Sequence, residues 1–284
     1  MKGVASSCAS VTVVNAMATG KGAAFGVELR LRAEVELDPT TTKIKGKVIG
    51  ARESPRLVEI CVRKVLEKYH HRCGARVKTY SEIPVAVGLS SSSAAANAAV
   101  LATFASLGIK PKWREVLELG IEASFEAGVT LTGAFDDAAA SLLGCGVITD
   151  NLKRRILKKF HIDPSLKVVI FVPPTKLYTS KVDISSFRDI RDLVDIAHKQ
   201  AILGNIFGAM VLNGLAYSHA LKHDPLIALE ALSKGALAAG LTGKGPAVAA
   251  IAYPEDVENI KNVWKRRGGR IIVTTPSKGG ARIE

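Results

Sequence analysis

Four consecutive serines, Ser90–Ser93, stand between an apolar run and an alanine-rich run in PVAVGLSSSSAAANAAV, residues 84–100. The pattern predicts a strand, a turn at Gly88 and a helix that begins within the serines. The first turn of a helix offers unpaired N–H groups and the positive end of the helix dipole, and a glycine turn lets an anion approach them. Serine hydroxyls add donors and a possible Mg²⁺ ligand. The stretch is either a phosphate-binding loop, which four serines favour, or a helix N-cap, which needs only one.

Adjacent carboxylates form a second candidate site in TLTGAFDDAAASLLGCG, residues 130–146. Asp136 and Asp137 lie among small and apolar residues, where burial is costly unless the carboxylates are paired or functional. Such a carboxylate can orient or deprotonate an attacking hydroxyl. Glu126, on the preceding predicted helix, could reach the same pocket as a metal ligand. Alternatively, one aspartate caps a helix that begins at Ala138, and the spacing leaves both interpretations open.

A third glycine-rich stretch, GLTGKGPAV, covers residues 240–248. Glycines around Thr242 suit close approach of the backbone to a ligand, and a plain turn between helix and strand is the alternative. Neither Gly243-Lys244-Gly245 nor Gly20-Lys21-Gly22 has the Ser or Thr that follows the lysine of a Walker A loop. The sequence therefore argues against a P-loop kinase.

Alternating short strands and helices must position these stretches, and their order predicts an α+β protein of two domains without internal repeats. The period-two alternation of GVELRLRAEVELD is typical of a strand, and helical spacing follows Pro55. A basic segment near 150–165 marks the boundary, with domains at 1–155 and 156–284. The predicted strands are 4–18, 26–38, 74–88, 167–174 and 269–275; the predicted helices are 55–71, 92–107 (ended by Gly108), 113–128, about 188–222, 225–239 and 255–268.

Composition indicates a globular chain: 284 residues, 48% of them hydrophobic and 23% charged. No apolar run approaches the roughly 20 residues of a membrane span. The N-terminal apolar stretch is too interrupted for a signal peptide, so we expect a cytoplasmic protein. The cysteines are scattered without a CxxC pair, which argues against a zinc site or a disulfide scaffold; they are Cys8, Cys61, Cys73 and Cys145.

The formal net charge of +13 fits either a nucleic-acid partner or small anionic substrates. The basic residues are spread along the chain, and aromatic residues make up only 5% of it, which leaves few stacking platforms for single strands. We therefore expect small-molecule substrates and neither a nucleic-acid nor a membrane partner, and a basic nucleic-acid-binding protein remains the alternative from another class. No pattern indicates an oligomeric state.

Taken in this order, the glycine-rich stretches resemble the GHMP kinase superfamily over essentially the whole chain. Its central motif, P-x-x-x-G-L-[GS]-S-S-[AS], is matched without a gap from Pro84 to Ser93, and its late motif by Thr242-Gly243-Lys244-Gly245-Pro246. Asp136-Asp137 corresponds to its Asp-Asn or Asp-Gln pair. The resemblance implies an N-terminal domain with a split β-α-β core, a ferredoxin-like C-terminal domain, and an active site in the cleft between them.

The resemblance also implies roles for individual residues. Asp136 is the implied catalytic residue, and Ser92 and Glu126 are the implied Mg²⁺ ligands, Glu126 with a small difference in spacing. Lys21, Asn15 and Asp137 are candidates for binding the acceptor. The residues implied to bind the phosphates of ATP are Pro84, Val85, Ala86, Val87, Gly88, Leu89, Ser90, Ser91, Ser92, Ser93, Ala94, Thr242, Gly243 and Gly245.

One position departs from the superfamily pattern: Ser10 stands where an N-terminal lysine is often found, and Lys21 is the candidate to supply that charge. Within the superfamily, the stretches at 14–31, 84–98 and 130–141 are similar to the archaeal family of shikimate kinases, which implies transfer of a phosphoryl group from ATP to shikimate. Homoserine kinases are the enzyme alternative. Further candidates for the acceptor's carboxylate and hydroxyls are Lys176, Arg282, Thr12 and Thr19.

Overall fold

Two long antiparallel strands, β1 (Lys2–Val14) and β2 (Lys21–Asp38), run through the centre of the structure, a computed structural model that describes residues 1–130, 132–174 and 185–284. In the second half of β2, Leu31, Ala33 and Val35 are buried, while the charged residues between them are more exposed. The period-two alternation in the sequence therefore gives a strand with one face in the core, as predicted.

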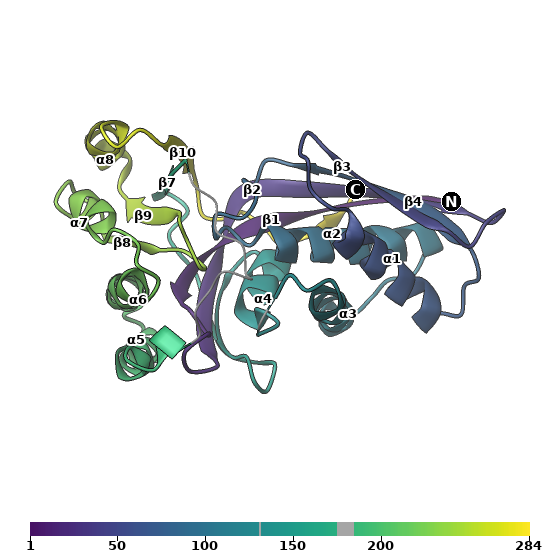
Figure 1. The fold of residues 1–284 in the computed structure, drawn as a ribbon, viewed down its shortest axis with the longest axis horizontal. Helices are drawn as coiled ribbons and strands as arrows, with labels where there is room; N and C mark the ends of the chain where they lie inside the picture. Colours follow the sequence, from purple (N-terminus) through teal and green to yellow (C-terminus); the bar gives the residue numbers. More distant parts are fainter. Residues whose placement is uncertain (131, 175–184) are drawn as a thin grey trace.

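These strands belong to a seven-stranded sheet whose order is β11-β1-β2-β4-β3, with β5 paired to β2 and β6 to β5. Helices α1 to α4 cover one face of this sheet (Figure 1). A β-α-β unit is formed by β3, α1 and β4, and its two strands are parallel and direct neighbours, with no strand between them. The remaining elements of this domain are β3 (Ile44–Ile49), α1 (Arg56–Lys68), β4 (Gly74–Ser81), α2 (Ser91–Leu107), α3 (Trp113–Glu126), α4 (Phe135–Leu143), β5 (Gly146–Asp150), β6 (Arg155–Phe160) and β11 (Arg282–Ile283).

The second domain has a four-stranded antiparallel sheet in the order β10-β7-β9-β8. Its strands and helices alternate as β7, α5 to α7, β8, β9, α8 and β10, which is the β-α-β-β-α-β plan of a ferredoxin-like domain. The chain then returns to the first sheet as β11. The elements are β7 (Lys167–Val172), α5 (Arg191–Leu203), α6 (Ile206–Ala220), α7 (Leu226–Leu232), β8 (Ala238–Leu241), β9 (Val248–Ala252), α8 (Val257–Lys265) and β10 (Arg270–Thr274), with 3₁₀ turns η2 (Ser185–Phe187) and η3 (Pro254–Asp256).

The two-domain α+β class is confirmed, but several boundaries differ from the predictions. The helix expected over 188–222 is two helices, because Gly204 adopts φ +98° and Asn205 caps α6. The helix expected over 225–239 ends at Leu232, and β8 follows. The strand expected over 74–88 ends at Ser81, and β3, β5, β6, β8 and β9 were not predicted. The first sheet continues to Phe160 through β6, so the change of sheet falls after the predicted boundary at 155.

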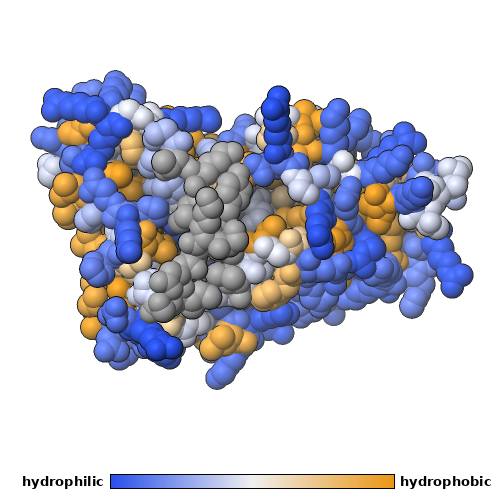
Figure 2. Space-filling view, viewed as in Figure 1, coloured by the Kyte–Doolittle hydropathy of each residue, from blue (hydrophilic) through white to orange (hydrophobic). Residues whose placement is uncertain are grey.

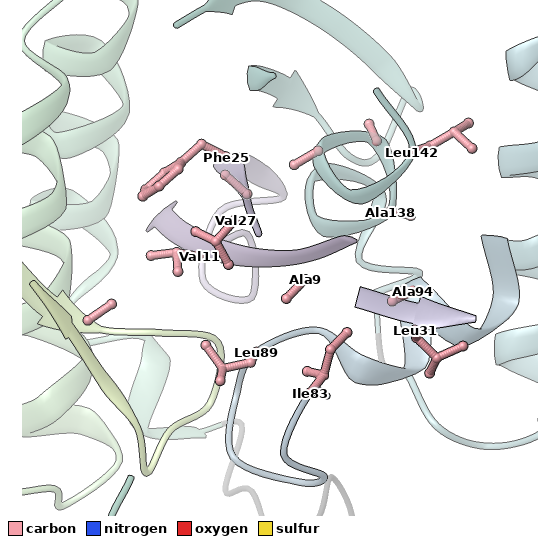
Figure 3. Packing of buried hydrophobic residues seen from close by; sticks show 14 of the residues in the cluster. Ala9, Val11, Phe25, Val27, Leu31, Ile83, Leu89, Ala94, Ala138 and Leu142 are labelled. Atoms are coloured by element: carbon pink, nitrogen blue, oxygen red, sulfur yellow. The ribbon is translucent and has the colours of Figure 1, made fainter. Parts of the chain in front are cut away.

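The loop after β4 carries part of the core as well as the serines. Leu89 lies among the buried side chains of this region, with Ile83, Ala9 and Val11 (Figure 3). Leu89 is 1% exposed, so the residue before the serines anchors the loop to the sheet. None of the helices in the described parts of the chain is long and apolar enough to cross a membrane.

Close contact between β1 and α2 depends on Gly3. A Cβ atom at this position would lie 2.1 Å from the carbonyl oxygen of Ala102 and 2.3 Å from the backbone nitrogen of Ser106. We expect Gly3→Ala to lower the free energy of unfolding by about 1–3 kcal/mol, because the backbones of β1 and α2 must move apart. Urea denaturation measures this. Gly279→Ala is the control, since a Cβ there meets nothing within 4 Å; equal stability of the two variants would contradict the close-packing argument.

Candidate active site

A pocket of about 380 Å³ lies where the end of β1, the N-termini of α2 and α4, and the β8–β9 loop come together. The three glycine-rich stretches of the sequence therefore meet at one place, which their spacing alone could not show. The lining residues are Thr12, Asn15, Ala16, Met17, Glu53, Val85, Ala86, Gly88, Ser90, Ser91, Ser92, Ser93, Ser124, Gly128, Val129, Thr130, Thr132, Gly133, Ala134, Asp136, Asp137, Gly243 and Lys244.

The serine run does not serve as a side-chain cap. Ser90 is the N-cap residue of α2, in the left-handed conformation with φ +56°, and it makes no side-chain cap hydrogen bond. Its hydroxyl is instead hydrogen-bonded to Asp137. Ser91, Ser92 and Ser93 form the first turn of α2 and line the pocket, so the unpaired N–H groups and the positive end of the dipole lie at its wall. This arrangement favours the phosphate-binding interpretation over the capping one.

The β8–β9 loop is joined to the loop before α2 by very close backbone approach. A Cβ atom on Gly88 would lie 2.0 Å from the carbonyl oxygen of Thr242. The Thr242 hydroxyl donates to the Gly88 carbonyl at 2.9 Å and accepts from the Thr12 N–H at 3.1 Å. The Gly243 N–H donates to the Thr12 hydroxyl, and its carbonyl accepts from the Asn15 side-chain amide. Glycine at 88 and 243 is thus required by contact between two chain segments.

Asp136 is buried, and its carboxylate is oriented by the strand that follows α4. The side-chain amide of Asn151 donates to Oδ1 at 2.8 Å, and the Thr149 hydroxyl holds the Asn151 side chain at 2.6 Å. Gly22 leaves room for the carboxylate, since a Cβ atom there would lie 2.3 Å from Oδ2. Burial raises the pKa of Asp136, and the hydrogen bond from Asn151 opposes that rise.

Asp137 faces the other side, toward the serines. The Ser10 hydroxyl donates to its Oδ1 at 2.9 Å, and the Ser90 hydroxyl and the charge of Lys244 also stabilise its ionised form. Burial and repulsion from Asp136 outweigh them and raise the pKa of Asp137 to about 7. Near neutral pH the two carboxyl groups are therefore not both fully ionised, and one of them can hold or release a proton.

The helix that carries these aspartates begins earlier than predicted. Its N-cap residue is Ala134, with no side-chain cap bond, so neither aspartate caps a helix that begins at Ala138. Both lie in the first turn of α4, where the helix dipole favours negative charge. The capping interpretation of the pair is wrong.

Glu126 was expected to be a metal ligand, and the structure places it elsewhere. Its side chain is 43% exposed, forms ion pairs with Arg63 and with Lys64 (3.5 Å), and does not line the pocket. It lies on the face of α3 that turns toward α1, so Ser92 and Glu126 are not brought together. No cluster of three or more His, Cys, Asp or Glu side chains suited to a metal ion occurs in the described ranges.

The basic residues considered for the acceptor are also away from the pocket lining. The Lys21 ammonium forms an ion pair with Asp195 of α5 at 2.9 Å, and Arg282 is exposed on β11. Thr19 hydrogen-bonds to the backbone of Lys21 in a local turn. Lys176 lies outside the described residues. Among the acceptor candidates, Thr12, Asn15 and Asp137 are in the lining.

Of the residues implied to bind phosphates, a smaller set faces the pocket. Val85, Ala86, Gly88, Ser90 to Ser93 and Gly243 line it. Val87, Leu89 and Ala94 are buried in the core behind it, and Thr242 and Gly245 shape the loop through their mutual backbone bond. Pro84 begins the turn. Two functional candidates were missed: Asn151, which carries no local signal, and Lys244, which lay inside the late motif without an assigned role.

Comparison with known proteins places this architecture in a family. Family models described as GHMP kinases N terminal domain and GHMP kinases C terminal match residues 56–145 and 225–270. The fold resembles a crystal structure of homoserine kinase from Cytophaga hutchinsonii, with a TM-score of 0.75, 18% identity and coverage of 100% of this chain and 97% of that one. It also resembles the mevalonate kinase of Methanococcus jannaschii, with a TM-score of 0.71, 15% identity and coverage of 97% and 98%.

The chain belongs to the GHMP kinases, and the prediction of that superfamily from sequence is confirmed. Within this superfamily, the chain is similar over nearly its whole length to archaeal proteins named shikimate kinase. The relative from Methanothrix thermoacetophila is 43% identical over 283 residues, covering 100% of this chain and 96% of its own. The relative from Pyrococcus furiosus is 42% identical over 278 residues, covering 97% and 100%.

Burial of the aspartate pair has a consequence for stability. The pKa of Asp137 is about 7 in the folded protein and near 3.8 when unfolded, so the unfolded chain loses its proton first and stability falls as pH rises from about 4 to about 7. We expect Asp137→Asn to raise the free energy of unfolding at pH 8 by about 1–3 kcal/mol, with little change at pH 4. Urea denaturation at both pH values measures the difference.

The matched control is Asp163→Asn. Asp163 is exposed, and a hydrogen bond from the Ser165 N–H lowers its pKa, so this variant gains no stability at pH 8. A similar gain for both variants, or none for Asp137→Asn, would contradict the assigned burial cost.

Proposed function

We propose that the protein transfers the terminal phosphoryl group of ATP to the 3-hydroxyl of shikimate, which yields ADP and shikimate 3-phosphate on the route to chorismate and the aromatic amino acids. The observation that carries the proposal is the meeting of the α2 N-terminus and the adjacent carboxylates of Asp136 and Asp137 in one pocket, within a chain 43% identical to an archaeal protein named shikimate kinase. A cytoplasmic location stays a prediction, in keeping with the use of ATP.

ATP binds, in this proposal, with its phosphates against the first turn of α2. Ser91, Ser92 and Ser93 offer backbone N–H groups and hydroxyls there. The N-terminus of α4 lies at the same pocket, so two helix dipoles favour the anionic phosphates. The positioning and charge neutralisation that they supply are what phosphoryl transfer chiefly requires of a protein.

Asp136 orients the acceptor hydroxyl and takes its proton as the new P–O bond forms. Its carboxylate is held by Asn151, and Gly22 leaves room beside it. Its raised pKa makes the Asp136 carboxylate a stronger base, which suits a group that takes a proton during the reaction. Asn15 and Thr12, at the end of β1, are placed to bind further hydroxyls of the acceptor.

Mg²⁺ accompanies ATP in this proposal, and hard oxygen donors in the lining fit it. The Ser92 hydroxyl and the Asp137 carboxylate both line the pocket, and Mg²⁺ commonly takes one or two protein oxygens together with phosphate oxygens. Asp137 replaces the expected Glu126 in that role. When bound, the ion neutralises phosphate charge.

Two alternatives are less well supported. Similarity to a homoserine kinase at 18% identity shows the fold and not the acceptor. A nucleic-acid-binding protein would gather its basic residues on one surface, whereas the lysines and arginines of this chain are spread along the whole sequence. Figure 2 shows hydrophilic residues at both ends of one face of the molecule, with apolar residues among them.

The acceptor is tested by measuring ADP release with Mg²⁺-ATP and, in turn, shikimate, homoserine, mevalonate and galactose. We expect turnover with shikimate alone, because relatives named shikimate kinase match nearly the whole chain. Turnover with another member of the panel and none with shikimate would refute the proposed acceptor while leaving the phosphate site intact.

The role of Asp136 is tested by Asp136→Asn. We expect turnover with shikimate to fall by roughly 10²-fold or more while ATP affinity stays within a few fold, because the amide keeps the shape and cannot accept the proton. Steady-state kinetics and calorimetric titration with ATP measure the two effects. Near-normal turnover would show that Asp136 is not the catalytic carboxylate.

A further inference from the structure

The pocket contains a basic side chain that the proposed function has not used. Lys244 is the one lysine or arginine in its lining, as far as the described residues show, whereas Glu53, Asp136 and Asp137 all contribute carboxylates. A site that binds ATP gathers several negative charges from the nucleotide. A basic side chain in this wall would add to the charge neutralisation by Mg²⁺ and the helix dipoles, and Lys244 is in the lining.

The backbone around Lys244 is held on both sides. Gly243 before it is bonded to Thr12 through its N–H and to Asn15 through its carbonyl. The carbonyl of Lys244 itself lies 3.0 Å from the Nε2 atom of His223 on the far side of the loop. A lysine on such a loop starts from a defined position, which reduces the conformational freedom lost when its ammonium binds a ligand.

The charge of Lys244 acts at the phosphate end of the pocket. Its electrostatic partner is Asp137, which is bonded to the Ser90 hydroxyl at the start of α2 and to the Ser10 hydroxyl on β1. Lys244 is partly buried, and its loop is in direct backbone contact with Gly88. Burial lowers the pKa of Lys244, and the carboxylate of Asp137 opposes this shift.

We propose that Lys244 is a catalytic residue whose ammonium contacts the transferring phosphoryl group and neutralises the charge on its oxygens. The inference rests on the proposed kinase activity. In the step, the bond between the acceptor oxygen and phosphorus forms, the bond from phosphorus to the oxygen retained by ADP breaks, and the acceptor's proton goes to Asp136. Lys244 keeps its protons and supplies charge alone.

The surroundings of Ser10 support this assignment. Ser10 on β1 contacts Asp137 through a neutral hydroxyl and brings no positive charge to it. Lys21, the sequence-based candidate for that charge, forms an ion pair with Asp195 of α5 instead. Lys244 interacts with the same carboxylate that Ser10 contacts, from the opposite end of the chain. The late glycine-rich loop thus provides the charge that β1 lacks.

The test compares Lys244→Met, which keeps the length of the side chain, with Lys244→Arg, which keeps the charge. Lys45→Met, on the exposed edge strand β3, is the matched control. We expect Lys244→Met to lower kcat with shikimate by roughly 10²-fold or more, with the KM for shikimate and the Kd for ADP within a few fold. Lys244→Arg should recover much of the loss, and the control should behave as the unaltered protein.

A second measurement does not depend on the acceptor. The complex of ADP with aluminium fluoride imitates the phosphoryl group in transfer, so Lys244→Met should weaken its binding at least about tenfold relative to ADP alone. If the unaltered protein does not phosphorylate shikimate, but Lys244→Met still weakens binding of the fluoride complex, the proposed acceptor is wrong and the role of Lys244 stands. If shikimate is used and Lys244→Met keeps both kcat and fluoride-complex affinity, the role of Lys244 is refuted. Unchanged kcat with a raised KM for shikimate also refutes it, and would assign Lys244 to the acceptor's carboxylate.

Discussion

The hydroxyl of Thr242 joins three segments that are far apart in the sequence. It donates to the carbonyl of Gly88 and accepts from the N–H of Thr12, across separations of 154 and 230 residues. Because Gly88 and Thr242 are in backbone contact, the loop of the second domain closes directly on the loop before α2. The pocket exists only while these segments stay together, so the proposed catalysis depends on this junction between domains.

The carboxylate pair lowers the stability of the folded protein at the proposed active site. Asp136 is buried and the neighbouring Asp137 is partly buried, and both have raised pKa values because removal from water disfavours their charge. The surrounding donors, Asn151, Ser10 and Ser90, offset that cost only in part. Buried like charges of this kind concentrate where a protein needs a proton held or moved near neutral pH. The two residues therefore have different surroundings: Asp136 is oriented by Asn151, just after β5, and Asp137 faces the serines at the start of α2.

Electrostatics also explains how a basic chain can be a small-molecule enzyme. The net charge is +13, yet the described lining of the pocket holds a single lysine and three carboxylates. Attraction for anionic substrates therefore comes from the surface as a whole and from two helix N-termini. The charge close to the reacting atoms comes from the few ionisable side chains that line the pocket. The family relationship fits this pattern, since GHMP kinases share the fold whichever acceptor they use.

The sequence alone determined the fold class, the family and the motifs, because hydrophobic periodicity and the glycine and serine patterns are local properties of the chain. It placed β2, α2 and the serine loop well, and missed the short strands β3, β5, β6, β8 and β9, whose few residues carry little periodic signal. Only the tertiary structure decided which residues meet. Glu126 had suitable chemistry, but its helix face directs it to Arg63 and Lys64. Asn151 carried no local sign of function, and Lys244 lay within a motif that assigned it no role, because side-chain direction and contacts follow from packing and not from spacing.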